Sequence, residues 1–219
     1  MKTFTFSTNS FSSEIPSWIG AFTHLQLLNL SSNNFTGVIP TSLFNLSKLS
    51  IFYLSSNNLQ GYIPEAIGNL YSLRLLSLEK NEFSDSIPSS IFNISSLEQI
   101  DFSNNRFSGA MPAILVNNTM SSLLMLDFGT NNLIGLLPPN MFTQFSNLEK
   151  LYLHSNLFYG PIPSTLIGCK RLKILSLSNN HFEGRIHKDI GNLTMLQVLH
   201  LASNNFSGRF RFCSYSFTC

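Results

Sequence analysis

The side chains best suited to chemistry in this sequence are acids and aromatic residues that recur at a nearly constant spacing. Carboxylates beside tyrosine rings can bind a cationic group, such as the side chain of Arg or Lys in a peptide. We expect ligand contacts from six residues of this kind and one lysine: Tyr53, Glu79, Lys80, Asp101, Asp127, Tyr152 and His154. The alternative is that these residues have only a structural role: Asp can be a routine residue at its position in a repeated pattern, and the tyrosines can simply cover the surface of a strand.

Catalysis and metal binding receive little support from the same inventory. The five histidines show no i,i+4 pairing and the chain has no Cys-x-x-Cys motif, so a zinc site is not predicted. Asp127-Phe128-Gly129 spells the metal-binding triplet of protein kinases, but no glycine-rich loop or His-Arg-Asp motif accompanies it. We therefore expect no enzyme, no cofactor and no metal site.

These residues belong to a repeat that runs along the chain. The pattern Leu-x-x-Leu-x-Leu-x-x-Asn appears clearly at Leu25–Asn33 and again at Leu172–Asn180. Its asparagine recurs every 24 to 26 residues, at Asn9, Asn33, Asn57, Asn81, Asn105, Asn131, Asn156, Asn180 and Asn204. A fixed period of this length indicates a solenoid. We predict nine tandem repeats of about 24 residues over 1–208, the first and last incomplete, and an irregular tail over 209–219.

Each part of the repeat predicts a structural element. In Leu-x-Leu the leucines point inward and the residue between them points outward, which predicts one short strand per repeat and a parallel sheet. The asparagine can bond backbone groups of adjacent turns, so we expect a buried ladder of amides. Two residues later comes an apolar position, where Phe stands in seven of the nine repeats. Stacked rings are the expected result.

The second half of the repeat carries glycine and proline. A glycine in seven repeats predicts a permissive backbone angle, and Ser13 and Asp85 take its place in the other two. The Ile-Pro pair, as at Ile39-Pro40, predicts extended chain on the lateral face. This pair is lost at Ile186-His187, where the pattern begins to decay.

The segment Asn33–Pro40, repeated at Asn57–Pro64, resembles the plant-specific class of extracellular leucine-rich repeats. The resemblance implies an α/β-type solenoid: a right-handed superhelix with a concave parallel sheet and a convex side of short 3-10 or irregular segments. It also implies a fragment of the ectodomain of a receptor-like kinase or receptor-like protein. Such a module binds a peptide or protein ligand, and a co-receptor ectodomain, through its concave face.

Two other interpretations remain open at this stage. One is a soluble cell-wall protein similar to the polygalacturonase inhibitors, although those carry cysteine caps and a signal peptide that we do not find here. The other is a truncated product without function, whose core residues Phe4, Phe6 and Phe206 would be exposed to water.

Composition and charge narrow the partners and the compartment. A net charge of +2 with 11% charged residues argues against nucleic acid. We find neither a signal peptide nor a stretch long enough to span a membrane. Asn-x-Ser/Thr sequons for N-glycosylation occur at Asn29, Asn34, Asn45, Asn93, Asn117, Asn192 and Asn205. With the resemblance, they place the parent protein at the extracellular face of the plasma membrane or in the apoplast.

The three cysteines have different expected fates. Cys169 replaces the asparagine of Ile-Gly-Asn and is predicted to be a buried thiol. Cys213 and Cys219 lie in the tail, where they form either a small disulfide similar to the family's C-terminal cap or part of an aberrant end.

Overall fold

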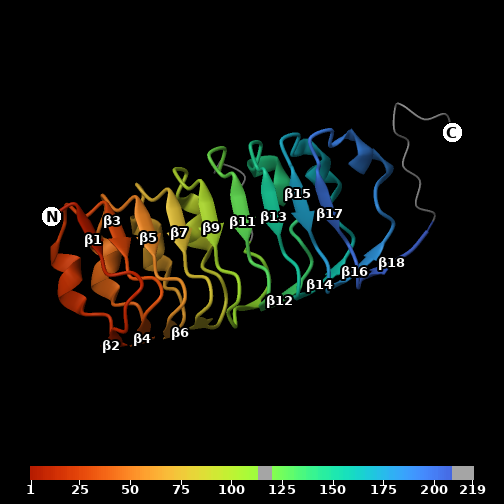
Figure 1. The fold of residues 1–219 in the computed structure, drawn as a ribbon. Coiled ribbons are helices and arrows are strands. Elements are labelled where there is room, and N and C mark those ends of the chain that lie inside the picture. Colours follow the sequence, from red (N-terminus) through yellow and green to blue (C-terminus); the bar gives the residue numbers. More distant parts are fainter. Residues whose placement is uncertain (113–119, 209–219) are drawn as a thin grey trace.

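In the computed structural model, which describes residues 1–112 and 120–208, one long parallel sheet runs the length of the molecule (Figure 1). Its nine strands follow chain order: β1 (Thr3–Thr5), β3 (Leu27–Asn29), β5 (Ile51–Tyr53), β7 (Leu75–Ser77), β9 (Gln99–Asp101), β11 (Met125–Asp127), β13 (Lys150–Tyr152), β15 (Ile174–Ser176) and β17 (Val198–His200). The middle residue of each strand points into the core, and the flanking residues face outward. The predicted solenoid with one strand per repeat is confirmed, and the outward side of this sheet is its concave face.

A second layer of short strands lines the lateral side and was not predicted from the sequence. Four of these strands pair as β2 (Ser12–Glu14), β4 (Asn34–Gly37), β6 (Asn58–Gly61) and β8 (Glu82–Phe83). Five more pair as β10 (Ser108–Gly109), β12 (Asn132–Gly135), β14 (Leu157–Gly160), β16 (His181–Gly184) and β18 (Asn205–Phe206). Because the asparagine and glycine positions anchor them, these strands hold successive repeats in register.

The convex side consists of single 3-10 turns behind the main sheet (Figure 1). They are η1 (Ser17–Ala21), η2 (Thr41–Asn45), η3 (Glu65–Asn69), η4 (Ser89–Asn93), η5 (Met141–Gln144), η6 (Ser164–Gly168) and η7 (Lys188–Asn192). A proline in extended conformation precedes five of them, as the Ile-Pro pattern predicts. Before η7, His187 adopts the same conformation (φ −60°, ψ 131°), and its Nδ1 accepts from the backbone N–H of Asp189 at 3.2 Å. The turn therefore survives the loss of proline.

The asparagine ladder joins each repeat to the one before it. Nδ2 of Asn81 donates to the carbonyl oxygens of Leu54, Leu78 and Glu79 at 3.0, 3.1 and 3.2 Å. Its Oδ1 accepts from the backbone N–H of Leu59 at 3.0 Å. The same pattern recurs along the solenoid, but the side chain of Asn9 bonds only carbonyls of its own repeat. The ladder is therefore confirmed from the second repeat onward.

The apolar position after the asparagine forms the expected spine, interrupted where leucine replaces phenylalanine. Neighbouring rings stack with centroids 6.0 to 6.4 Å apart in four pairs: Phe11–Phe35, Phe83–Phe107, Phe158–Phe182 and Phe182–Phe206. Buried Leu59 and Leu133 fill the intervening positions. Cys169 is buried as predicted, and burial raises the pKa of its thiol to about 12.

The assignment of Phe6 to the core is wrong, because its side chain is 43% exposed. β1 is an edge strand, so a neighbouring repeat covers the ring on one side only. Phe4 is nevertheless buried, and Phe206 is half-buried. At the first repeat, Phe6 instead contacts Phe4 and Phe11, with ring centroids 4.7 and 5.1 Å away.

Left-handed backbone occurs at two positions of the repeat, and only one was foreseen. The glycine position has positive φ throughout, including Asp85 at 61° and Ser13 at 99°. The second position immediately precedes the asparagine of the ladder and holds residues such as Ser56 and Lys80 at 55–56°. This turn aims the asparagine amide into the solenoid, and no glycine marks it in the sequence.

No helix within residues 1–112 and 120–208 is long and apolar enough to cross a membrane. Asn117 and the pair Cys213 and Cys219 lie outside the described residues.

Candidate ligand-binding face

The predicted site residues lie on the concave face, at the carboxyl ends of neighbouring strands. Asp101, Asp127 and Tyr152 are direct register partners on β9, β11 and β13. Tyr53 ends β5, two strands away from β9, and is separated from Asp101 by Ser77 of β7. The three residues that follow the strands extend the same surface: Glu79, Lys80 and His154. The repeat thus brings together residues that are about 100 positions apart in the chain.

Asp127 is the most perturbed group of this surface. Burial raises the pKa of its carboxyl to about 7, the N–H of Gly129 lowers it, and the nearby charges of Asp101 and Glu79 raise it further. The pKa of Glu79 is also raised, first by burial and then by Asp101, while Lys80 lowers it. Three carboxylates therefore share one stretch of the face, and none forms an ion pair within the described part of the chain.

Two of the acids also stabilise their own loops. Oδ1 of Asp127 accepts from the backbone N–H of Gly129 at 2.9 Å, and Oδ1 of Asp101 accepts from the N–H and the hydroxyl of Ser103 at 3.0 and 2.7 Å. Asn29 makes the same bond to Ser31. In both aspartates, Oδ1 therefore has the structural role that the alternative interpretation predicted. Oδ2 of each aspartate makes no hydrogen bond among the described residues and is not fully buried, so it is available to a ligand.

His154 occupies space that glycine leaves open on the neighbouring strand end. A Cβ atom on Gly129 would collide with Cε1 and Nδ1 of the His154 ring. Nδ1 is buried and has no hydrogen-bond partner within the described residues. Burial, and then the neighbouring His200, lower the pKa of the imidazole, so the ring is neutral near pH 7. Tyr152 packs edge-on against it, with ring centroids 6.4 Å apart.

Beside the acids lies a shallow depression of about 230 Å³. It is lined by Tyr53, Ser55, Leu76, Ser77, Gln99, Asp101 and Met125. The depression supplies one carboxylate, one phenol and apolar surface within a single cleft.

Sequence reasoning missed one column of the concave face. Because both neighbours of the central strand residue face outward, the first residue of each strand is as exposed to a ligand as the third. This first column is largely apolar and half-buried: Leu27, Ile51, Leu75, Met125, Ile174 and Val198. The alternation of inward and outward residues along each strand predicts this column, but the apolar residues that fill it are typical of a core and so did not suggest a binding surface.

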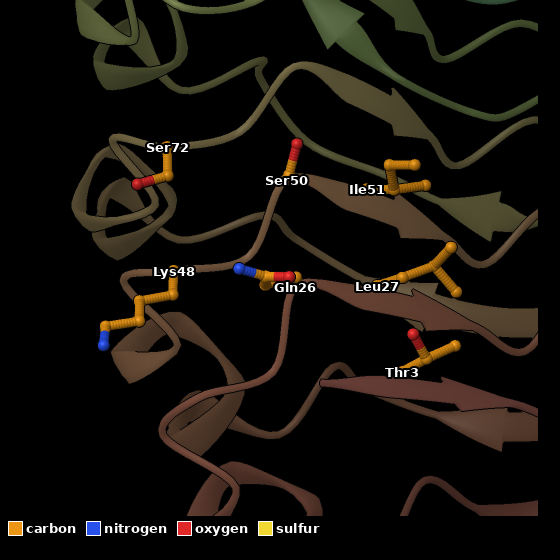
Figure 2. Close-up of a pocket in the computed structure, with 7 residues that line it drawn as sticks. All are labelled: Thr3, Gln26, Leu27, Lys48, Ser50, Ile51 and Ser72. Carbon is orange, nitrogen blue, oxygen red and sulfur yellow. The ribbon is translucent and has the colours of Figure 1, made fainter. Parts of the chain in front are cut away.

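A cleft with a volume of about 610 Å³ lies at the start of this apolar column, over β1, β3 and β5 (Figure 2). Its lining residues are Thr3, Gln26, Leu27, Lys48, Ser50, Ile51 and Ser72. None of them was singled out from the sequence.

The sequons fall on different surfaces. Asn45, Asn93 and Asn192 end the convex turns η2, η4 and η7 and are exposed. Asn34 and Asn205 are exposed at the start of lateral strands. Asn29 is half-buried on the concave face, where its Oδ1 is already engaged.

Within the described residues no group of three or more His, Cys, Asp or Glu side chains is arranged to hold a metal ion. Phe128 of the kinase-like triplet is fully buried in the core, in frame with the repeat.

Sequence families give a clear assignment. Models described as leucine-rich repeat match residues 23–83 and 47–107, and again residues 147–169 and 171–193. Together these segments cover more than half of the chain. The chain belongs to the leucine-rich repeat family. No curated protein matches this leucine-rich repeat chain by sequence.

Among solved structures, the leucine-rich repeat chain is similar to plant receptors. It is 35% identical to the Arabidopsis receptor kinase HAESA, solved with the peptide hormone IDA and the co-receptor SERK1, with a TM-score of 0.89 over 94% of this chain and 34% of that one. It is 34% identical to the plant peptide hormone receptor RGFR1, solved with RGF2, with a TM-score of 0.86 over 91% of this chain and 32% of that one. The chain thus spans about a third of the length of either receptor.

Proposed function

We propose that this chain is a peptide-recognition module, a fragment of a plant cell-surface receptor ectodomain that binds a peptide ligand on its concave face and engages a co-receptor ectodomain. Its similarity to HAESA and RGFR1, both solved with peptide hormones, supports this function. The parent protein then faces the outside of the plasma membrane or the apoplast. The role is binding and not catalysis.

The carrying observation is the unpaired acidic surface next to Tyr152. Glu79, Asp101 and Asp127 lie on adjoining repeats and form no salt bridge among the described residues, although Lys80 lowers the pKa of Glu79. Their mutual repulsion is relieved when a further cation binds. A guanidinium or ammonium group against carboxylates and a tyrosine ring is a strong polar contact. We therefore expect a peptide that carries Arg or Lys.

A selection experiment tests this function without knowledge of the natural ligand. The intact chain is presented to a display library of random linear peptides, and the enriched sequences are synthesised. Their affinity is measured by fluorescence anisotropy for the unchanged chain and for the double variant Asp127→Ala/Tyr152→Ala. We expect enrichment of Arg and Lys, and a loss of more than about tenfold in affinity, because a hot-spot pair of charge and ring is removed.

A matched control is available on the lateral face. Tyr159 on β14 and Glu183 on β16 are an exposed ring and an exposed acid on adjoining repeats, so Tyr159→Ala/Glu183→Ala should leave affinity unchanged. Circular dichroism checks that both double variants are folded. An equal loss in both pairs, or none in either, would exclude the acidic surface as the binding site.

A further inference from the structure

The cleft at the start of β1, β3 and β5 has two chemically different walls. Figure 2 shows Thr3, Leu27 and Ile51 on three successive strands at one side, and Lys48 and Ser72 on turns at the other. Leu27 and Ile51 are half-buried and supply the apolar wall. Gln26 and Ser50 lie between the two walls. A ligand that fits this cleft must combine an apolar group with a polar one.

The polar wall is unusual because its hydrogen-bonding side chains are unused. The side chains of Gln26, Lys48, Ser50 and Ser72 make no hydrogen bond or ion pair within the described residues. Backbone groups nearby are satisfied, since the carbonyl of Gln26 accepts from the N–H groups of Ser50 and Ile51. By contrast, the hydroxyl of Ser96, two repeats after Lys48, is bonded to two carbonyls.

Lys48 differs from three other basic residues near this rim of the sheet, which are paired with acids. Arg74 contacts Glu98 at 2.7 Å, Lys173 contacts Glu149 at 2.7 Å, and Arg171 contacts Glu149 at 3.6 Å. Lys48 has no such acid, and no acidic side chain lines the cleft. The cleft therefore carries an uncompensated positive charge beside donors from Ser and Gln, which complements an anion.

We infer that this cleft binds an anionic group of the peptide, a carboxylate, next to an apolar side chain that packs on Leu27 and Ile51. This inference rests on the proposed function, and it specifies which end of the bound peptide is acidic and which is basic. The carboxylate accepts from Lys48 and the hydroxyls of the polar wall, while a cationic residue of the same peptide meets Asp101 and Asp127.

The sheet geometry sets the spacing between the two ends. From β5 to β11 there are three strand intervals, which at ~4.8 Å each amount to about 14 Å. The acids end their strands whereas Ile51 begins its own, which adds ~7 Å along the strand direction, so the two ends lie at least ~16 Å apart. An extended peptide rises ~3.3 Å per residue, so about five or more residues separate the acidic and the basic position. The ligand is thus a short segment with opposite charges at its two ends and an apolar side chain at the acidic one.

The test repeats the library selection with Lys48→Ser beside the unchanged chain. Serine is the residue that the next two repeats hold at this position, as Ser72 and Ser96, so the variant keeps the fold. The control is Lys170→Ser, which removes an exposed lysine on the convex side. Peptides selected on the unchanged chain and on the control should be enriched in an acid about five or more residues from Arg or Lys. That enrichment should disappear on Lys48→Ser.

A double-mutant cycle then measures the contact itself. For one selected peptide, Glu→Gln in the peptide or Lys48→Ser in the protein should each weaken binding about threefold to fivefold, as expected for an exposed charge pair. The two changes together should cost no more than either alone. An amidated C-terminus forms a separate arm, which distinguishes a terminal carboxylate from a side-chain one.

The possible failures are distinguishable. If no peptide is enriched, the proposed function fails and this inference fails with it. If the enriched peptides carry Arg or Lys but show no acidic bias, or if the cycle is additive, the cleft does not bind the anion and the proposed function stands. Equal losses on Lys48→Ser and Lys170→Ser would likewise overturn the inference, since they would reflect overall charge.

Discussion

The imidazole of His154 lies over Gly129 of the preceding repeat, in space that any other residue would fill. Gly129 is buried, but its φ is not positive, so glycine is required here for room and not for backbone freedom. The ring in turn packs edge-on against Tyr152, the register partner of Asp127. A gap in one repeat thus shapes the ligand surface of the next.

Gly129→Ala should therefore displace His154 and destabilise the fold by about 1 kcal/mol, in the range for an overpacked site. His154→Ala, introduced into the same protein, should restore most of that loss, because it removes the colliding ring. Urea unfolding of the four proteins in this cycle measures the coupling. If the second change brings no recovery, the ring does not occupy that space.

The asparagine ladder predicts a large effect at a buried repeat. Asn81→Ala removes the acceptor for the N–H of Leu59 and the donor for three carbonyls, so it should destabilise the chain by more than about 1 kcal/mol. Asn58→Ala is the matched control, since that side chain is exposed and makes no hydrogen bond among the described residues. Equal unfolding midpoints for the two variants would show that the ladder contributes little.

Asp127 should make both stability and binding depend on pH, with opposite signs. Its pKa is raised from 3.8 to about 7 in the folded state, so the native protein binds more protons than the unfolded chain between these values. Stability therefore falls as pH rises from about 4 to 7. Binding of a basic peptide requires the ionised carboxylate, so affinity rises over the upper part of that range, by about tenfold between pH 5.5 and 7.5.

The measurements are urea unfolding and anisotropy at several pH values. In Asp127→Asn both slopes should flatten, whereas Glu79→Gln should flatten them less, because Glu79 is the less buried acid. A basic peptide that binds equally at pH 5.5 and 7.5, or an unchanged slope in Asp127→Asn, would contradict the assignment.

Glycan occupancy should follow the surface on which each sequon lies. For a chain directed through the secretory pathway of plant cells, we expect glycans at Asn45 and Asn192, because both are exposed at the ends of convex turns. Asn29 should remain unmodified, since it is half-buried on the concave face and its amide oxygen is bonded to Ser31. Glycopeptide mass spectrometry reports each site, with Asn45→Gln as the control. A glycan at Asn29 would also block the neighbouring cleft and so oppose the proposed ligand path.

The sequence by itself determined the solenoid, because a strict period dictates which residues repeat the same contacts. The spacing of Asn57 and Asn81, the alternation around Leu76 and the glycine at Gly61 each predict a local structure that neighbouring copies reinforce. The same frame also identified Asp101, Asp127 and Tyr152 as neighbours, since residues one period apart must lie side by side in a parallel sheet.

Tertiary structure decided what depends on packing between repeats. The lateral strands form because the backbone around the glycine position of one repeat pairs with the backbone of the next repeat. Phe6 is exposed because β1, as an edge strand, has only one neighbouring strand. The raised pKa of Asp127, the ring of His154 over Gly129 and the unpaired charge of Lys48 depend on depth and on distances between side chains. A one-dimensional period gives the order of residues along the face, and only the packed structure gives how deeply each one is buried and which of them lack a partner.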